Sequence, residues 1–235
     1  MNRSVITASA FATFGFAILC GLGIWQLERL QWKEKLIATL NSRVSAPAVA
    51  LPAAPEQTTD EFRRVRARVQ FTSGGHALVY TPGSALRPDV PGAGYWVMAP
   101  AKSERGAIVI NRGYVAPNAR ANAGAAPSGD VEIVGALRWP EEGTYFTPRD
   151  EPANNVWYLR DPVSIAAAKN WGAVAPFYIE QEAPQLPGAP KAGPLVVKLP
   201  NNHLQYAITW FGLAGALAAV YFVWLRSRLR RVTPR

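Results

Sequence analysis

Two long runs of apolar residues lie near the two ends of the chain, and neither contains a charged side chain. The first, Ile6 to Leu27, has 22 residues and as a helix would be about 33 Å long. The second, Tyr206 to Leu225, has 20 residues. A helix needs about 20 apolar residues to cross the hydrocarbon core of a bilayer, so both runs predict membrane helices. Aromatic residues of the interfacial kind stand at their ends, namely Trp25, Trp32, Tyr206, Trp210, Tyr221 and Trp224.

The first apolar run also invites comparison with a cleaved signal peptide. It is longer than the apolar region of a usual signal, and Trp25-Gln26-Leu27-Glu28 follows it in place of a small-x-small cleavage site. Cys20 lacks the small preceding residue of a lipoprotein site, because Ile18-Leu19 stands before it. We therefore expect an uncleaved anchor. Its helix should continue beyond the membrane, since the stretch from Trp25 to Leu40 contains neither proline nor glycine.

Between the two runs, short stretches alternate between apolar and polar residues, as half-buried strands do. The clearest is 64–71, in which three arginines and a glutamine alternate with apolar side chains. Glycine and proline clusters separate it from further candidates. These candidates are Ala77–Thr81, Tyr95–Ala99, Ala107–Asn111, Val131–Trp139, Val156–Leu159, Phe177–Glu182 and Leu195–Leu199.

One helix is expected in this middle region, at Asp161–Lys169, with Asp161 as N-cap and Pro162 at the first helical position. The stretches Ala116–Gly129 and Ala183–Pro194 are rich in Ala, Pro and Gly and should be loops. About eight short strands with one or two helices predict an antiparallel barrel-like or sandwich-like domain. The predicted fold class is thus membrane-anchored, with two transmembrane α-helices flanking a mostly β extracytoplasmic domain.

The net charge of +9 is concentrated at the ends of the chain. Residues 1–43 carry an excess of +3, residues 44–202 only +1, and residues 203–235 carry five arginines and no acid. The arginines after the second run predict cytoplasmic termini and a translocated middle domain, although Arg29, Lys33, Lys35 and Arg43 oppose this on the other side. The expected segments are a membrane helix with its extension (5–43), the β-rich domain (44–202), a second membrane helix (203–226) and a basic cytoplasmic tail (227–235).

The composition argues against several classes of function. A nucleic-acid binder concentrates positive charge on its folded domain, and here the middle domain is nearly neutral. The single cysteine, Cys20, lies in the first apolar run and cannot form an intrachain disulfide. We expect no enzyme, because the sequence shows no nucleophile–base pair, P-loop or haem-attachment CxxCH motif. His76 follows a Gly-Gly turn, and its role stays open.

The other histidine, His203, stands where the second apolar run begins, and an ionisable residue at such a place needs a reason. Pro200-Asn201-Asn202 is typical of a helix start with an asparagine N-cap. The positive end of a helix disfavours the imidazolium form and so favours a ring that can bind a metal. Tyr206 and Trp210 follow on the same helical face. This face either flanks a porphyrin bound by His203 or is an interfacial aromatic belt with a polar histidine.

The two membrane helices also carry small residues four positions apart, which allow helix backbones to approach closely in lipid. Ordinary alanine-rich membrane composition explains the same pattern. The pairs are Ala8/Ala12 and Ala17/Gly21 in the first helix, and Gly212/Ala216 and Gly215/Ala219 in the second.

Several motifs together resemble the Surfeit-locus-one (Shy-type) family of cytochrome c oxidase assembly factors over nearly the whole chain. The end of the first helix, residues 22–33, is similar to the family's Gly-x-Trp-Gln-x-x-Arg-x-x-Trp-Lys pattern. Residues 109–115 are similar to its Asn-Arg-Gly-aromatic-Val motif, and 146–150 and 157–161 fit its central region, apart from Arg149 at a position expected to vary. The closing stretch, residues 202–211, is the most specific of these.

The resemblance implies a membrane-bound factor that matures the haem-bearing subunit of cytochrome c oxidase, with haem a bound or delivered on the way. It implies His203 as the axial ligand of the haem iron, and Tyr206 and Trp210 would flank the ring. Arg112 lies in a family motif, and it either meets a haem propionate or partner carboxylate or caps a strand end. The positive φ of a turn is the ordinary reason for Gly113.

The expected partners are the haem-bearing oxidase subunit, the enzymes of haem a synthesis and membrane lipid. No mitochondrial transit segment precedes the first run, so a bacterial inner membrane is expected, with both termini cytoplasmic and the middle domain periplasmic. The alternative is a scaffold without haem that stabilises oxidase assembly intermediates. In that reading Arg64, Arg66 and Arg68 would form a docking face, although a solvated strand face explains them as well.

Overall fold

The computed structural model describes residues 3–90, 92–188 and 190–232. The chain divides into two compact units. The helical unit comprises residues 1–38 and 199–235, and the barrel unit comprises residues 39–198.

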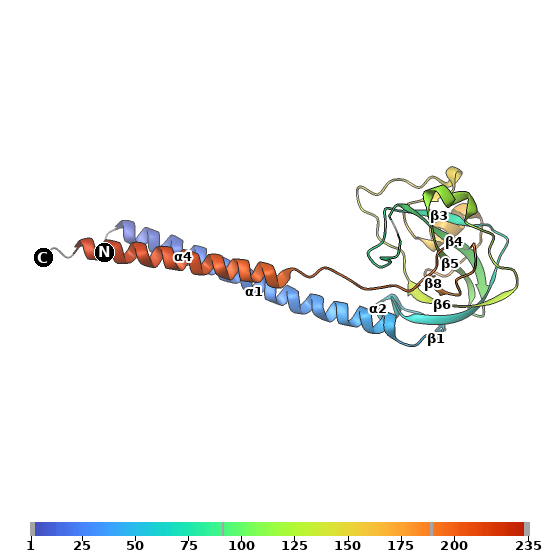
Figure 1. The fold of residues 1–235 in the computed structure, drawn as a ribbon, viewed down its shortest axis with the longest axis horizontal. Helices are drawn as coiled ribbons and strands as arrows, with labels where there is room; N and C mark the ends of the chain where they lie inside the picture. Colours follow the sequence, from blue (N-terminus) through green and yellow to red (C-terminus); the bar gives the residue numbers. More distant parts are fainter. Residues whose placement is uncertain (1–2, 91, 189, 233–235) are drawn as a thin grey trace. The chain divides into compact units, whose positions relative to one another are not determined.

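The helical unit consists of two long helices that lie side by side and run antiparallel (Figure 1). They are α1, Arg3–Ser45, and α4, His203–Val232. Both are long and apolar enough to cross a membrane, as the two apolar runs predict. The expected continuation of the first helix is confirmed, because α1 runs without interruption past Leu40 to Ser45. The two helices are consistent with a membrane-anchored protein.

Three glycines of the small pairs noted in the sequence lie away from the contact between the helices. An ideal Cβ on Gly21, Gly212 or Gly215 would meet no atom within 4 Å, so these glycines are not at the contact. A Cβ on Gly23 would lie 2.7 Å from the Phe211 ring, and one on Gly15 would lie 3.3 Å from Leu217. Near the other end, the hydroxyls of Ser9 and Tyr221 form a hydrogen bond. The contact is therefore a large side chain against a glycine, which spacing alone does not reveal.

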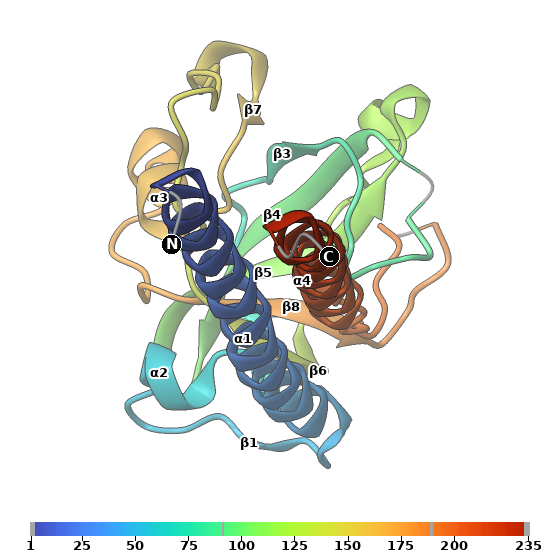
Figure 2. The same ribbon diagram turned by 90° about the vertical axis from the view of Figure 1, so that its left-hand side faces the viewer.

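The barrel unit contains a closed ring of strands in the order β2, β6, β8, β5 and β4, with β4 pairing back onto β2. Figure 2 labels four of these strands, β4, β5, β6 and β8. Outside the ring, β3 pairs with β4, β7 pairs with β3, and β1 pairs with β2. The β5–β8 pair inside the ring is parallel, so the ring is not wholly antiparallel as expected. The strands are β1 Val49–Ala50, β2 Arg64–Phe71, β3 Ala77–Thr81, β4 Gly94–Ser103, β5 Gly106–Val115, β6 Asp130–Arg138, β7 Val156–Trp157 and β8 Tyr178–Ala183.

Alternation along the strands divides the apolar side chains between two cores. In β2, Val65, Ala67 and Val69 point into the ring and are buried, as the period-two pattern predicts. A second core on the outer face of β4, β5 and β8 includes Trp96 and Tyr178. Ile165 of α3 packs into this second core. The short helices are α2 Gln57–Asp60, α3 Pro162–Lys169, η1 Pro117–Asn122 and η2 Pro152–Asn154.

The predicted cap of α3 is confirmed, because the Asp161 carboxylate accepts hydrogen bonds from the backbone N–H groups of Val163 and Ser164.

The predicted strand Leu195–Leu199 is wrong, because these residues have no regular secondary structure. The alternating apolar residues of this segment are buried nevertheless, since Leu195 and Val197 are 8% and 5% exposed. The Val196 N–H donates to the Leu86 carbonyl at 2.8 Å, but prolines at 194 and 200 bracket the segment and interrupt any longer ladder.

Gly113 offers a test of a close backbone contact in the barrel. Its φ is +122°, and an added Cβ would lie 2.4 Å from the Lys191 backbone. Gly113→Ala should lower the free energy of unfolding by about 3 kcal/mol or more, from strain and clash together. Gly129→Ala is the matched control, with φ +79° and open space around its Cβ, and should cost about 1 kcal/mol. Urea unfolding of the full chain in detergent measures both, and equal losses would contradict a role for close approach.

Candidate functional site

His203 is the first residue of α4, and its hydrogen-bond partner Gln26 also lies in the helical unit. The N–H of Tyr206 donates to the Asn202 carbonyl at 3.2 Å, which places Asn202 at the cap position of the helix. The His203 ring is half-buried, so one part of it faces protein and another part stays accessible. This position therefore suits a group that holds a ligand from the side.

A short hydrogen bond fixes the His203 ring to the first helix. Nδ1 of His203 lies 2.7 Å from Oε1 of Gln26. An amide oxygen only accepts hydrogen bonds, so with this amide orientation Nδ1 carries the proton and donates it. The lone pair is then on Nε2, the nitrogen that remains free to bind a metal. Metal-binding histidines commonly donate their other N–H to such an oxygen, which fixes both tautomer and ring orientation.

The packing of α1 against α4 holds Gln26 in place. Gln26 is only 9% exposed, and Gly23, one helical turn earlier on the same face, is also buried. The Phe211 ring covers Gly23, and Ala207 of α4 is 1% exposed. Small residues on each helix thus let the backbones approach closely enough for the Gln26 amide to reach the histidine.

Tyr206 and Trp210 lie three and seven residues after His203, within the same helix. Tyr206 is 55% exposed and Trp210 is half-buried. Among the described residues, neither ring has an aromatic partner or a hydrogen bond. The two rings are therefore available to contact a flat apolar ligand held by Nε2, and lipid at a membrane interface would contact them in the same way.

Arg112 lies in the barrel unit, in β5, and is 4% exposed. Its guanidinium donates to the carbonyls of Gly124 and Ala125, at 3.0 Å each, and lies over the Phe71 ring. Burial lowers its pKa from the ordinary value. These contacts fasten the loop before β6 to the barrel. A contact with a haem propionate or a partner carboxylate stays a prediction.

The neighbours of Arg112 in its motif also have local partners. Asn111 is fully buried, and its side-chain oxygen accepts a hydrogen bond from the Gly113 N–H at 3.1 Å. The positive φ expected of Gly113 is confirmed, but within a strand and not in a turn. The glycine is required there because the backbone of Lys191 crosses directly against it.

His76, the second histidine, is half-buried in the barrel unit. Burial, and then the positive charges of Lys169 and Arg112, lower its pKa from the ordinary value of 6.5, so the ring is neutral at pH 7. In the part of the chain that the structure describes, no group of three or more His, Cys, Asp or Glu side chains could hold a metal ion.

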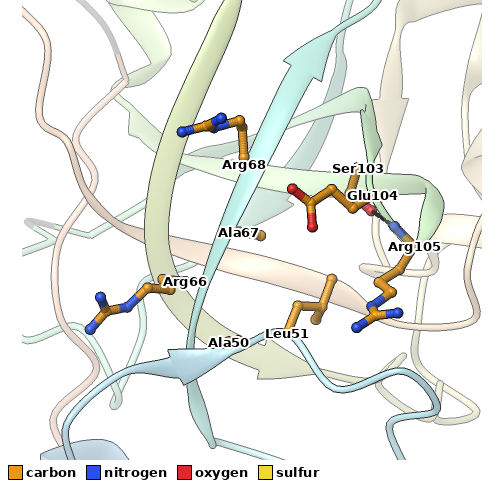
Figure 3. Close-up of a pocket in the computed structure, with 8 residues that line it drawn as sticks. All are labelled: Ala50, Leu51, Arg66, Ala67, Arg68, Ser103, Glu104 and Arg105. Carbon is orange, nitrogen blue, oxygen red and sulfur yellow. Dashed lines mark hydrogen bonds between the residues drawn. The ribbon is translucent and has the colours of Figure 1, made fainter.

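The arginines of β2 are only partly available as a docking face. Arg64 forms a two-pronged ion pair with Glu182, at 2.9 and 2.8 Å, and Arg66 donates to the Ala48 carbonyl. Arg66, Arg68, Glu104 and Arg105 are among the residues that line a hollow of about 90 Å³. In Figure 3 the Arg66 and Arg68 side chains point away from Glu104 and Arg105. This volume holds only a few water molecules. A docking role for these arginines stays a prediction.

Comparison with known proteins places the helix pair and the barrel in one family. The model of the SURF1 family matches residues 13–215. Surfeit locus protein 1 of Rattus norvegicus is 35% identical over 239 residues, covering 94% of this chain and 76% of the rat protein. The Homo sapiens protein of that name is 34% identical and covers 89% and 74%. A SURF1-like protein of Monosiga brevicollis is 34% identical and covers 92% and 88%.

Sequence reasoning missed Gln26 as a residue of the candidate site. Gln26 lies within the motif at the end of the first apolar run, where a polar amide among apolar residues was the available signal. Its partner is 177 residues away along the chain, and no local pattern connects the two. Only the packing of α1 against α4 brings them together.

Gly23 provides a test of the packing that positions Gln26. A Cβ in Gly23→Ala would displace the Phe211 ring, and we expect the helix pair to lose about 1–3 kcal/mol of stability. Gly21→Ala, two residues earlier, is the matched control because its Cβ enters open space. It should stabilise α1 by up to about 1 kcal/mol through helix propensity. Thermal unfolding in detergent, followed by far-UV circular dichroism, measures both, and equal melting temperatures would contradict the contact.

Proposed function

Because the chain belongs to the SURF1 family of cytochrome c oxidase assembly factors, we propose that it is a membrane-bound assembly factor for this oxidase. In this proposal it binds haem a through His203 and passes it to the haem-bearing subunit. It performs no catalytic step itself. The single observation that supports the haem role is the hydrogen bond from His203 Nδ1 to Gln26, which leaves Nε2 free.

The residues at the start of α4 fit an axial haem ligand. The Gln26 amide orients the ring and raises the electron density on Nε2, as outer partners of metal-binding histidines do. Tyr206 and Trp210 offer apolar rings along the same helix. The bound haem supplies the iron that Nε2 coordinates. The chain's own contribution is to orient the histidine, present the aromatic rings and keep the site open on one side.

Partial exposure supports delivery more than permanent storage. A carrier must release its cargo, which requires modest affinity and an open path. His203 is half-buried and Tyr206 is 55% exposed, so the ligand face is accessible from outside the helix pair. A haem enclosed between two protein ligands would be released much more slowly.

The proposed setting is the bacterial inner membrane, with α1 and α4 spanning it and in contact with lipid. The arginines near the end of α4 support cytoplasmic termini, which would place the barrel in the periplasm and His203 at the outer membrane face. The proposed route begins with direct receipt of haem a from the enzymes that make it. The partners are then the haem a synthesis enzymes and the haem-bearing oxidase subunit.

The haem spectrum of the purified protein tests His203. The chain is co-expressed with the enzymes of haem a synthesis, purified, and compared with His203→Ala. We expect loss of the axial-ligand signature and at least a tenfold lower haem content, because removing a metal ligand removes the bond that orients the iron. His76→Ala is the matched control, because it removes the other histidine of the chain. An unchanged spectrum in His203→Ala would exclude it as the ligand.

Gln26 gives a second, independent test of the site. In Gln26→Leu the ring loses its acceptor, so its tautomer and orientation are no longer fixed, and haem affinity should fall about 10–100-fold. Gln31→Leu makes the same change on an exposed position of α1 and should leave affinity unchanged. Haem titration into each variant in nanodiscs measures the difference. Equal affinities for the two variants would remove Gln26 from the site.

A scaffold without haem is the second candidate function, and one observation favours it. Tyr145 and Phe146, in the loop that follows β6, are 97% and 87% exposed, and large exposed aromatic side chains are typical of protein interfaces. A scaffold would dock through this pair and would not need His203. If His203→Ala lost haem but supported full oxidase assembly in cells, while Tyr145→Ser with Phe146→Ser did not, the scaffold would be favoured.

A further inference from the structure

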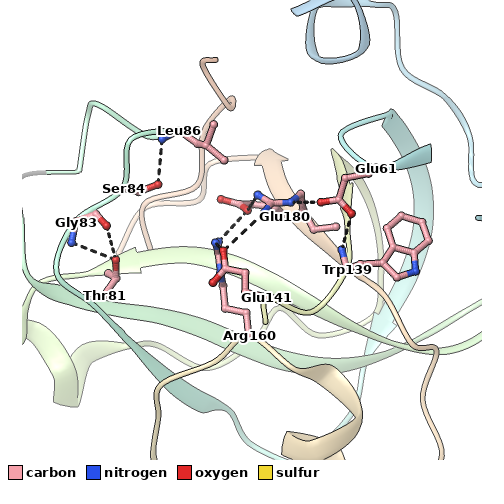
Figure 4. Close-up of polar contacts among 10 residues, drawn as sticks. Glu61, Thr81, Gly83, Ser84, Leu86, Trp139, Glu141, Arg160 and Glu180 are labelled. Carbon is pink, nitrogen blue, oxygen red and sulfur yellow. Dashed lines mark hydrogen bonds and ion pairs between the residues drawn. The ribbon is translucent and has the colours of Figure 1, made fainter. Parts of the chain in front are cut away.

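A cluster of five charged side chains lies at one end of the barrel unit and has no role in the proposed haem site (Figure 4). Glu180 of β8 is at its centre, and its Oε2 is 3.1 Å from Arg160 Nη1 and 3.5 Å from Arg138 Nη1. Arg138 also donates to Glu61 at 2.8 Å. Arg160 Nη2 donates to Glu141. The two arginines thus share the buried Glu180 carboxylate and also the more exposed Glu141, whose Oε1 lies 3.8 Å from Arg138 Nη2. Arg138 has Glu61 as a third partner.

The two carboxylates on Arg160 differ in burial. The Glu180 side chain is 1% exposed, whereas the Glu141 side chain is 43% exposed and lies on the loop after β6. Burial alone would raise the pKa of Glu141, but the charge and hydrogen bond of Arg160 outweigh it and lower this pKa. Arg160 needs a negative partner on its outer side, because a buried guanidinium left half-paired is costly. Glu141 meets this need from a position open to solvent.

Arg160 and Glu141 both line a pocket of about 320 Å³. The loop from Thr81 to Leu86 forms one wall and satisfies its own polar groups: the Thr81 hydroxyl bonds with Gly83, and the Ser84 hydroxyl accepts from the Leu86 N–H (Figure 4). The Trp96 and Tyr158 rings also line the pocket. Arg160 lies over the Trp96 ring, 5.6 Å from its centre. The pocket therefore offers a fixed cation next to aromatic surface.

We propose that this pocket binds a ligand with a carboxylate on an apolar body, and that the ligand's carboxylate replaces Glu141 on Arg160. Glu141 then acts as an internal stand-in that keeps Arg160 paired when the pocket is empty. Glu180 holds Arg160 from the buried side throughout, so the cation stays in position during the exchange. The apolar body packs on Tyr158 and on Tyr80, which also lines the pocket and is 39% exposed. The volume suits one or two amino-acid residues or a small carboxylic acid, and the shared chemistry of both is the carboxylate.

A purely structural ion pair predicts a different behaviour of Glu141 from an exchangeable one. If Glu141 only stabilises the fold, neutralising it costs stability and changes no binding. If it competes with a ligand, neutralising it raises the affinity for carboxylates, because a tethered competitor at millimolar effective concentration is removed. Binding affinity and stability therefore separate the two roles.

The experiment uses the full chain in nanodiscs and ligand-observed NMR titration, with empty nanodiscs subtracted. One arm compares phenylpropionate with its neutral amide, phenylpropionamide. The other compares the peptide acetyl-Leu-Asp-Leu-amide with acetyl-Leu-Asn-Leu-amide. In one of the two arms, we expect the acid to bind at least tenfold more tightly than its neutral counterpart. The arm with the tighter acid identifies the source as a small molecule or a peptide.

Glu141→Gln should then tighten binding of that acid about tenfold. Glu142→Gln is the matched control, since Glu142 is exposed, adjacent, and makes no ion pair among the described residues. It should leave the affinity unchanged. Equal binding of acids and amides, or equal affinities in the two variants, would overturn the proposal. If Glu141→Gln did not fold, the comparison of acids with amides on the unaltered chain would still decide.

Discussion

The hydrogen bond between His203 and Gln26 is the interaction on which the candidate site depends. It joins the two helices at the residue where α4 begins, far from the Ser9–Tyr221 hydrogen bond near their other end. A polar pair of this kind is sensitive to helix register, because a shift by one residue would rotate either side chain off the shared face. The close packing of Gly23 against Phe211 sets that register. Nε2 of His203, the atom proposed as ligand, is thus positioned by packing several residues away from it.

In the barrel unit, the motif residues have a different kind of role. Asn111, Arg112 and Gly113 lie in consecutive positions of β5, and each makes a contact within the barrel: with a neighbouring N–H, with two loop carbonyls, and with the backbone near Lys191. A recognisable motif is therefore not by itself a binding site. Here the three residues lock a strand, a loop and a returning segment together. This rigidity holds the strands that position Glu180 and Trp96 on the outer face of the sheet.

Local patterns predicted the two long helices and most of the strands, but not the 3-10 helix η1 within the expected loop Ala116–Gly129 or the contacts between distant segments. The two apolar helices, the alternation in β2 and the Asp161 cap depend on nearby residues, and the structure contains all three. The stretch Leu195–Leu199 alternates in burial without pairing, because its flanking prolines limit backbone hydrogen bonding. Barrel closure through β2 and β4, the parallel β5–β8 pair and the Gln26–His203 bond join segments far apart in sequence. Periodicity carries no information about such pairings.

The two candidate sites have the same physical arrangement, which suits temporary binding. In each, a fixed inner partner orients the binding group: Gln26 orients His203, and Glu180 holds Arg160. In each, the outer side is accessible, at the half-buried imidazole and at the 43% exposed Glu141 side chain. The inner contact orders the side chain before a ligand binds, so less conformational entropy is lost on binding. Affinity for a ligand therefore increases without the ligand being enclosed. An assembly factor must release what it binds, and a group oriented from within but open to the outside combines specific binding with release.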